Sequence, residues 1–222
     1  MLNYVVEPAL LQPLVPAGVE LDQFQENTYI SLVGFEFQRT RVCGVAVPFH
    51  QNFEEVNLRF YVRHGEKRGV VFLRELVPRR AVAAVARFAF NENYGATPMS
   101  HRIETDSNGE AVAAEYSWGA AQNRCSMRIE TEGDPFLPPD GSLSQFITEH
   151  YWGYAAGRGG GCLEYEVEHS RWLVRNAKHA SFSGDAATFY GSHFAEALSR
   201  EPASAFLANG SPVTVFQATR LV

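Results

Sequence analysis

Apolar and polar residues alternate along residues 53–63 with the period of two that is typical of a β-strand. The apolar positions share one predicted face: Val56, Leu58, Phe60 and Val62. Residues 64–69 are polar and contain two glycines, and residues 70–77 return to a strand-like run. The two runs therefore predict a β-hairpin.

The rest of the chain predicts mainly strands with a few helices. Further strands are predicted at residues 28–37, 41–47, 99–105, 111–118, 123–131, 162–169, 172–182 and 212–221. Helices are predicted at residues 7–15, 79–90, 143–154 and 188–198, with Ser142 and Gln145 as a capping box for the third. Strands and helices do not alternate regularly, which argues against a doubly wound parallel sheet. We predict one mainly antiparallel β domain over residues 1–222, a sandwich or barrel with a few covering helices.

Composition narrows the class of protein further. The chain has 222 residues, of which 45% are hydrophobic, and a formal net charge of -6. This balance excludes a mainly disordered chain, and a pI near 5.7 argues against a nucleic-acid partner. No apolar run is long enough for a spanning helix, and the first residues lack a signal-peptide pattern. We therefore expect a cytoplasmic protein without a membrane partner.

The cysteines argue against two common kinds of site. Cys43, Cys125 and Cys162 are odd in number, far apart and without C-x-x-C spacing. That pattern favours neither a disulfide framework nor a thiolate zinc site. We predict reduced thiols, no metal and no cofactor.

Two charges interrupt the otherwise apolar strand at residues 70–77. Strict alternation puts Glu75 on one face and Arg74 on the other. Their predicted companions are Val71, Leu73 and Val77 for Glu75, and Val70, Phe72 and Leu76 for Arg74. A strand that is apolar on both sides is buried, and a buried carboxylate needs a partner.

The polar face of the preceding strand offers partners for these charges, in Glu55, Asn57 and Arg59. Two interpretations follow. The charges form an internal Arg–Glu network, or they line a polar pocket whose acid exchanges protons or binds a ligand.

The segment Arg74-Glu75-Leu76-Val77-Pro78-Arg79-Arg80 resembles the R-E-x-x-G-x-P-K-K region of the acetoacetate decarboxylase-like proteins. The chain is more similar to a branch of unknown function, the YqjF-like proteins. The similar segments are residues 15–18, 55–62, 69–72, 78–82, 146–151 and 168–172. This resemblance implies an antiparallel β-barrel or cone-like sheet with helices outside it. The implied pocket lies near Arg74, Glu75, Arg79 and Arg80.

The resemblance does not extend to the nucleophile of the decarboxylases. Those enzymes form a Schiff base with a lysine of the P-K-K motif, where this chain has Arg79 and Arg80. A guanidinium stays protonated at any working pH and is no amine nucleophile. The chain has two lysines, Lys67 and Lys178, and we expect both to be solvated. We therefore predict that no imine forms with a ketone substrate through this motif.

Three functions remain open from the sequence. The leading prediction is that the pocket binds a small organic anion, a carboxylate, through Arg59, Arg74, Arg79, Arg80 and Asn57. The first alternative is a non-covalent lyase or isomerase with Glu75 or Glu55 as general acid or base. The second is a structural or interaction protein whose Arg–Glu network satisfies itself. The sequence fixes neither the ligand nor the oligomeric state.

Overall fold

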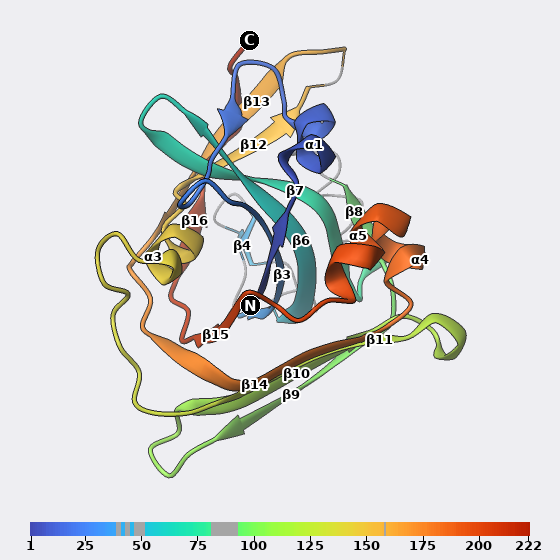
Figure 1. The fold of residues 1–222 in the computed structure, drawn as a ribbon, viewed down its shortest axis with the longest axis vertical. Helices are drawn as coiled ribbons and strands as arrows, with labels where there is room; N and C mark the ends of the chain where they lie inside the picture. Colours follow the sequence, from blue (N-terminus) through green and yellow to red (C-terminus); the bar gives the residue numbers. More distant parts are fainter. Residues whose placement is uncertain (39–40, 43–44, 47–51, 81–92, 158) are drawn as a thin grey trace.

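The computed structural model describes residues 1–38, 41–42, 45–46, 52–80, 93–157 and 159–222 (Figure 1). Most of the helix predicted at residues 79–90 lies outside these ranges, as does Cys43. In the ranges that are described, no helix is long and apolar enough to cross a membrane.

Long strands make up most of the fold. They are β1 (Leu2–Val6), β3 (Thr28–Phe37), β6 (Phe53–His64), β7 (Lys67–Val77), β9 (Met99–Thr105), β10 (Ala111–Trp118), β11 (Cys125–Thr131), β12 (Trp152–Ala156), β13 (Cys162–His169), β14 (Val174–Gly184) and β15 (Ser204–Ala208). The shorter strands are β2 (Glu20–Leu21), β4 (Arg41–Val42), β5 (Val45–Ala46), β8 (Tyr94–Ala96), β16 (Val213–Val215) and β17 (Thr219–Arg220). The helices are α1 (Pro8–Leu11), α3 (Leu143–Thr148), α4 (Ala186–Tyr190) and α5 (Ser192–Leu198), with 3-10 turns at Gln12–Leu14 and Ala121–Asn123.

Nearly all of these strands belong to one large sheet, in the order β16-β13-β12-β7-β6-β3-β1-β15-β14-β11-β10-β9. The pairs along this order are antiparallel except β7 with β12, and β8 also joins β7 in parallel. The predicted mainly β fold is therefore confirmed. The order does not return to its start, so the described strands form an open, curved sheet and not a closed barrel. One open edge is β9, whose residues are mostly exposed.

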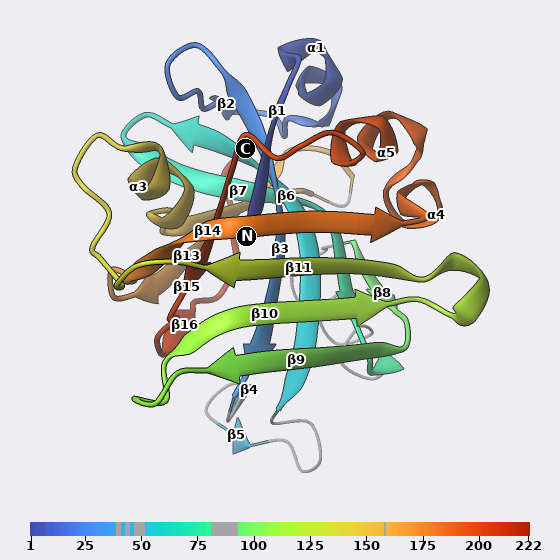
Figure 2. The same ribbon diagram turned by 60° about the horizontal axis from the view of Figure 1, so that its bottom comes forward.

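The curvature folds the sheet over onto itself as two layers. Figure 2 shows β9, β10, β11 and β14 lying across β3 and β6. The main core fills the space between these layers and includes Leu32, Leu58, Phe60 and Trp118, all fully buried. The predicted apolar face of β6 is therefore the face that packs into this core.

A bulge in β7 changes the predicted faces of the hairpin. Leu58 pairs with Arg74, but its neighbour Arg59 pairs with Phe72, so Leu73 is the extra residue. Strict alternation was therefore wrong for Val70, Val71 and Phe72: Val70 lies on the Glu75 face, opposite Tyr61, and Val71 on the Arg74 face, opposite Phe60. The bulge turns Phe72 to the same face of the sheet as Glu75.

The helices are shorter than the sequence predicts. The helix expected at residues 143–154 ends at Thr148, because the chain then enters β12, which pairs with β13. The helix expected at 188–198 is divided by Gly191, whose φ of 81° no helix allows. The side chains of α3 pack on the face of β6 opposite the main core, through Phe146 and Ile147.

Candidate functional site

A row of polar side chains follows one face of β6. Because β6 pairs regularly with β3, Glu55, Asn57, Arg59 and Tyr61 all point away from the main core. Neighbouring strands extend the row sideways. Glu75 of β7 lies opposite Asn57, and Tyr94 of β8 lies opposite Glu75. We call Glu55, Asn57, Glu75 and Tyr94 the carboxylate cluster.

Glu55 is the best-defined member of the carboxylate cluster. Its side chain is 2% exposed, and its two oxygens accept hydrogen bonds from Asn57 Nδ2 at 3.1 Å and Tyr94 OH at 3.0 Å. Burial raises the pKa of Glu55 from 4.5 to about 7, against the two hydrogen bonds and the Arg59 charge, which lower it. Burial therefore makes the neutral, protonated form of this carboxyl group accessible near neutral pH.

Glu75 and Tyr94 complete the carboxylate cluster. Glu75 is as deeply buried as Glu55. The pKa of the Tyr94 phenol is well above its usual value. Burial is the main cause, and the charges of Glu55 and Glu75 raise the pKa further. The phenol therefore remains a hydrogen-bond donor between the two carboxyl groups.

Arg59 carries the positive charge at the other end of the row. Its guanidinium lies 5.8 Å from the centre of the Tyr61 ring, and its Nη2 is 3.4 Å from the Ile147 carbonyl oxygen. Across the described part of the chain, no carboxylate forms an ion pair with Arg59, and its buried Nε has no hydrogen-bond partner. The half-buried guanidinium of Arg59 therefore has an N–H group that can donate a hydrogen bond to a ligand.

The structure separates Arg74 from this row. Arg74 points to the opposite face of β7, where its Nη1 donates to Asn93 Oδ1 at 2.6 Å. Arg79 and Arg80 follow the end of β7, the first half-buried and the second exposed.

Both lysines also lie away from the carboxylate cluster. Lys67 forms an ion pair with Glu164 at 2.7 Å and lies over the Trp152 ring. Lys178 is exposed on β14.

Sequence reasoning missed the polar roles of Tyr94 and His150. The contact of Tyr94 with Glu55 depends on the parallel pairing of β8 with β7. His150 is buried beside Arg59 and Tyr61. No local pattern marks either contact, since both join segments far apart in the sequence. Within the ranges described, no three metal-ligating side chains gather closely enough to hold an ion.

Solved structures with this fold define its class. The chain is similar to an acetoacetate decarboxylase-like enzyme from Sphingomonas wittichii RW1, with a TM-score of 0.66 and 15% identity over 99% of this chain and 89% of that one. It is also similar to acetoacetate decarboxylase from Legionella pneumophila, with a TM-score of 0.69 and 9% identity over 100% and 83% of the two chains. The enduracididine biosynthesis enzyme MppR, complexed with pyruvate, gives a TM-score of 0.63 and 10% identity over 99% and 84%. The fold is acetoacetate decarboxylase-like.

The sequence itself places the chain in a narrower group. Residues 1–212 match DUF2071, a family described as an uncharacterized conserved protein, and the chain belongs to this family. A relative is the uncharacterized protein YqjF of Bacillus subtilis, which is 29% identical over 186 residues, covering 79% of this chain and 72% of YqjF. The resemblance to the YqjF-like branch is confirmed.

Proposed function

We propose that the protein binds a small organic anion over the polar row of β6, with Arg59 as the counter-ion and Asn57 and Glu55 as hydrogen-bonding groups. The observation that carries this proposal is the buried Nε of Arg59, which no described residue satisfies. Buried polar atoms in native proteins are nearly always hydrogen-bonded, so a ligand or water supplies the acceptor. A carboxylate fits a guanidinium through two parallel hydrogen bonds.

The surroundings of the row suit the carbon skeleton of such an anion. Phe35 pairs with Glu55, and Phe72 pairs with Arg59. Both residues are half-buried and lie on the same face of the sheet as the polar row of β6. Glu55 and Arg59 lie four residues apart, or about 13 Å along a strand. Arg79 and Arg80 directly follow β7 near the Glu55 end of the row, and we retain them as contacts for the anion. Among proteins of this fold, MppR has been solved with pyruvate bound.

A titration with small carboxylic acids tests the proposal. We expect acetate, pyruvate, succinate or benzoate at millimolar concentration to raise the melting temperature of the wild-type protein. Replacing Arg59→Met should weaken the affinity at least tenfold, because the ligand loses a charge-assisted hydrogen bond.

Arg63→Met is the matched control for this titration. Arg63 lies on the same face of β6 and forms a solvent-exposed ion pair with Glu20 at 3.0 Å. The proposal fails if none of these acids stabilises the wild-type protein, or if Arg63→Met weakens binding as much as Arg59→Met.

The pKa of Glu55 favours a second candidate function, non-covalent proton transfer to or from the bound acid. A general acid or base works best when its pKa lies near the working pH, and burial brings the pKa of Glu55 to about 7. The carboxyl group of Glu75 lies in the same cluster and is the alternative base.

Exchange of carbon-bound hydrogen in D₂O tests this second function. We expect the wild-type protein to exchange carbon-bound hydrogen of a bound acid that carries a second carbonyl group, at the carbon next to that carbonyl and remote from the carboxylate, where the acid reaches Glu55, as followed by proton NMR. Glu55→Gln should abolish the exchange and leave the binding of the acid within a few-fold. Exchange that persists in both Glu55→Gln and Glu75→Gln would rule out this function.

We propose a cytoplasmic location for the protein. The free thiols of Cys125 and Cys162 support this location.

A further inference from the structure

His150 lies in a box of aromatic rings at the Arg59 end of the polar row. The Tyr61 ring is 4.6 Å from the imidazole, centre to centre, and the Phe146 ring stands edge-on at 5.6 Å. The His150 side chain is 3% exposed. Neither ring nitrogen has the geometry of a full hydrogen bond with any described residue, although the Ile147 carbonyl lies close enough to act on the imidazole. A histidine buried this deeply without a partner is rare in native proteins.

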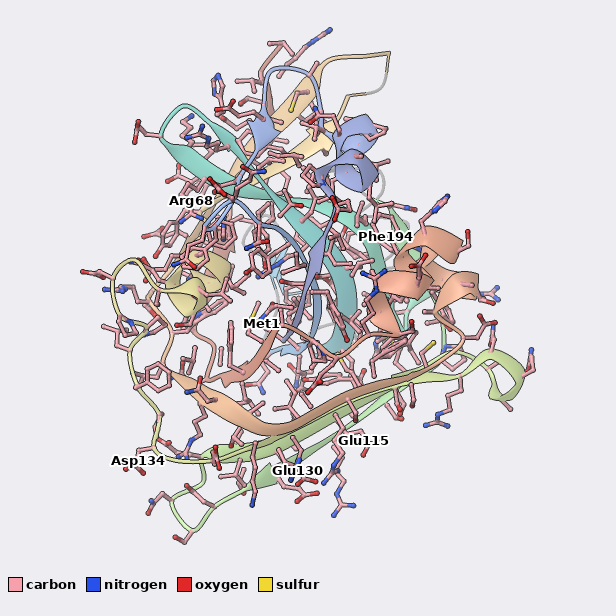
Figure 3. The ribbon with its side chains drawn as sticks, viewed as in Figure 1. Met1, Arg68, Glu115, Glu130, Asp134 and Phe194 are labelled. Atoms are coloured by element: carbon pink, nitrogen blue, oxygen red, sulfur yellow. The ribbon has the colours of Figure 1, made fainter. Side chains whose placement is uncertain are left out.

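Two arginines flank this imidazole. The charges of Arg68 and Arg59, together with burial, hold the pKa of His150 well below 6.5, while the Ile147 carbonyl acts weakly in the opposite direction. Arg68 lies over the Phe146 ring at 4.4 Å, and its Nε donates to Asp22 Oδ2 at 2.7 Å. Figure 3 shows Arg68 on the hairpin above α3.

The donors of these three residues outnumber their acceptors. Arg59 Nε, Arg68 Nη2 and both ring nitrogens of His150 are buried and have no hydrogen-bond partner in the described structure. Among the described residues, Asp22 is the carboxylate that contacts this cluster, with its Oδ2 at 2.7 Å from Arg68 Nε and 4.0 Å from His150 Nε2. Because the imidazole is neutral, the two arginines and Asp22 sum to one positive charge. A single negative charge would balance the cluster.

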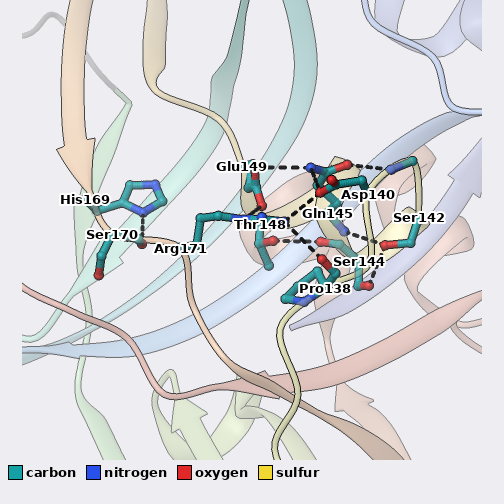
Figure 4. Close-up of polar contacts among 11 residues, drawn as sticks. Pro138, Asp140, Ser142, Ser144, Gln145, Thr148, Glu149, His169, Ser170 and Arg171 are labelled. Atoms are coloured by element: carbon teal, nitrogen blue, oxygen red, sulfur yellow. Dashed lines mark hydrogen bonds and ion pairs between the residues drawn. The ribbon is translucent and has the colours of Figure 1, made fainter.

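The contacts around α3 hold this cluster in place. Glu149, which precedes His150, accepts from Arg171 Nε, and Arg171 Nη2 also donates to Asp140 at 3.2 Å and to the Pro138 carbonyl at 3.0 Å (Figure 4). Thr148 Oγ1 donates back to the Ser144 carbonyl at 2.7 Å. The cluster is therefore preorganised, which lowers the entropic cost of binding an anion.

We propose that Arg59, Arg68 and His150 form the subsite for the carboxylate of the bound acid, and that this subsite favours a singly charged carboxylate over a dianion. This inference rests on the proposed function and names the residues and the charge class of its ligand. The neutral imidazole donates one N–H to a carboxylate oxygen, and the two guanidinium groups supply the others. Asp22 limits the positive charge and so disfavours a second negative charge on the ligand.

Three substitutions test the subsite with acetate as the probe. His150→Phe keeps a ring in the aromatic box and removes both nitrogens, and we expect acetate affinity to fall about tenfold. Asp22→Asn removes the competing negative charge, and we expect acetate affinity to rise several-fold. His101→Phe is the matched control, because His101 pairs with Glu54 at 3.0 Å and its ring stacks on Tyr116, outside the subsite. Inorganic phosphate at pH 8, mainly a dianion, should bind the wild-type protein at least tenfold more weakly than acetate.

The outcomes separate this inference from the proposed function. Affinity is measured by calorimetry, and the ring nitrogens of His150 are followed by ¹⁵N NMR during the titration. Suppose that acetate binds the wild-type protein and that Arg59→Met abolishes this binding. If His150→Phe and Asp22→Asn then bind acetate as His101→Phe does, the proposed subsite is wrong and the proposed function stands. If phosphate binds more tightly than acetate, the charge class is wrong. If no carboxylic acid binds the wild-type protein, the proposed function fails and the subsite fails with it.

Discussion

At the scale of single residues, Glu55 shows how desolvation can outweigh hydrogen bonding. The carboxyl group accepts from Asn57 and Tyr94, and both bonds favour its charged form. Burial favours the neutral form more strongly and brings the pKa to about 7. A carboxyl group with a raised pKa binds more protons in the folded than in the unfolded protein between pH 4.5 and 7. Its contribution to stability therefore falls as the pH rises through this range.

Glu55→Gln should remove this pH dependence. The rise in pKa from 4.5 to about 7 corresponds to about 3 kcal/mol. The free energy of unfolding of Glu55→Gln, relative to the wild type, should therefore increase by up to about 3 kcal/mol between pH 4.5 and pH 8.5. Urea denaturation at both pH values measures the difference.

The control for this measurement is Glu166→Gln, since Glu166 is an exposed strand residue of β13. Its stability relative to the wild type should be the same at both pH values. A Glu55→Gln curve parallel to that of the wild type would show that folding does not shift the pKa of Glu55.

At the scale of elements, α3 depends on its cap because it is only six residues long. The predicted cap at Ser142 is confirmed, since its Oγ accepts from Gln145 N at 3.2 Å. In a capping box the Gln145 side chain would also accept from the backbone N–H of Ser142, but here its partner is a different residue. The Gln145 side chain accepts from Gly141 N at 2.7 Å, one residue earlier than predicted. Such a short helix has little stability of its own, so capping and packing on β6 maintain it.

Ser142→Ala should lower the free energy of unfolding by about 1 kcal/mol, the usual cost of losing a side-chain cap. Urea denaturation measures the loss. Ser170→Ala, in the exposed loop before β14, should change stability by less than about 0.5 kcal/mol. Equal effects of the two substitutions would show that the cap does not stabilise α3.

At the scale of the whole molecule, the two layers of the curved sheet approach closely at Gly34 of β3. A Cβ atom built at Gly34 would lie 2.7 Å from the Tyr116 ring of β10 and 3.3 Å from Met127 Sδ of β11. Neither atom can move far, because Tyr116 and Met127 are both buried in the main core. Glycine therefore permits the spacing between the layers.

Gly34→Ala should destabilise the protein by about 1–3 kcal/mol, the usual cost of overpacking a core. Tyr116→Leu in the same chain should relieve part of that cost, so the double-mutant cycle should show a favourable coupling. Urea denaturation of the four proteins gives the coupling energy. Strictly additive effects would mean that the Tyr116 ring does not limit the space at Gly34.

The sequence by itself determined the local structure of this protein. Alternation along β6 predicts its buried face, the turn at residues 64–69 predicts the hairpin, and the run at residues 70–77 predicts a buried charge. These features depend on a residue and its near neighbours, where side-chain periodicity and burial cost decide the outcome. The segment from Arg74 to Arg80 also indicated the fold family.

Only the tertiary structure decided which groups meet. The bulge at Leu73 reversed the predicted face of Phe72, the parallel pairing of β8 brought Tyr94 to Glu55, and α3 brought His150 to Arg59. The open strand order is likewise set by pairings between distant strands. Contacts of this kind depend on how separate segments pack, and no periodicity within one segment specifies that packing.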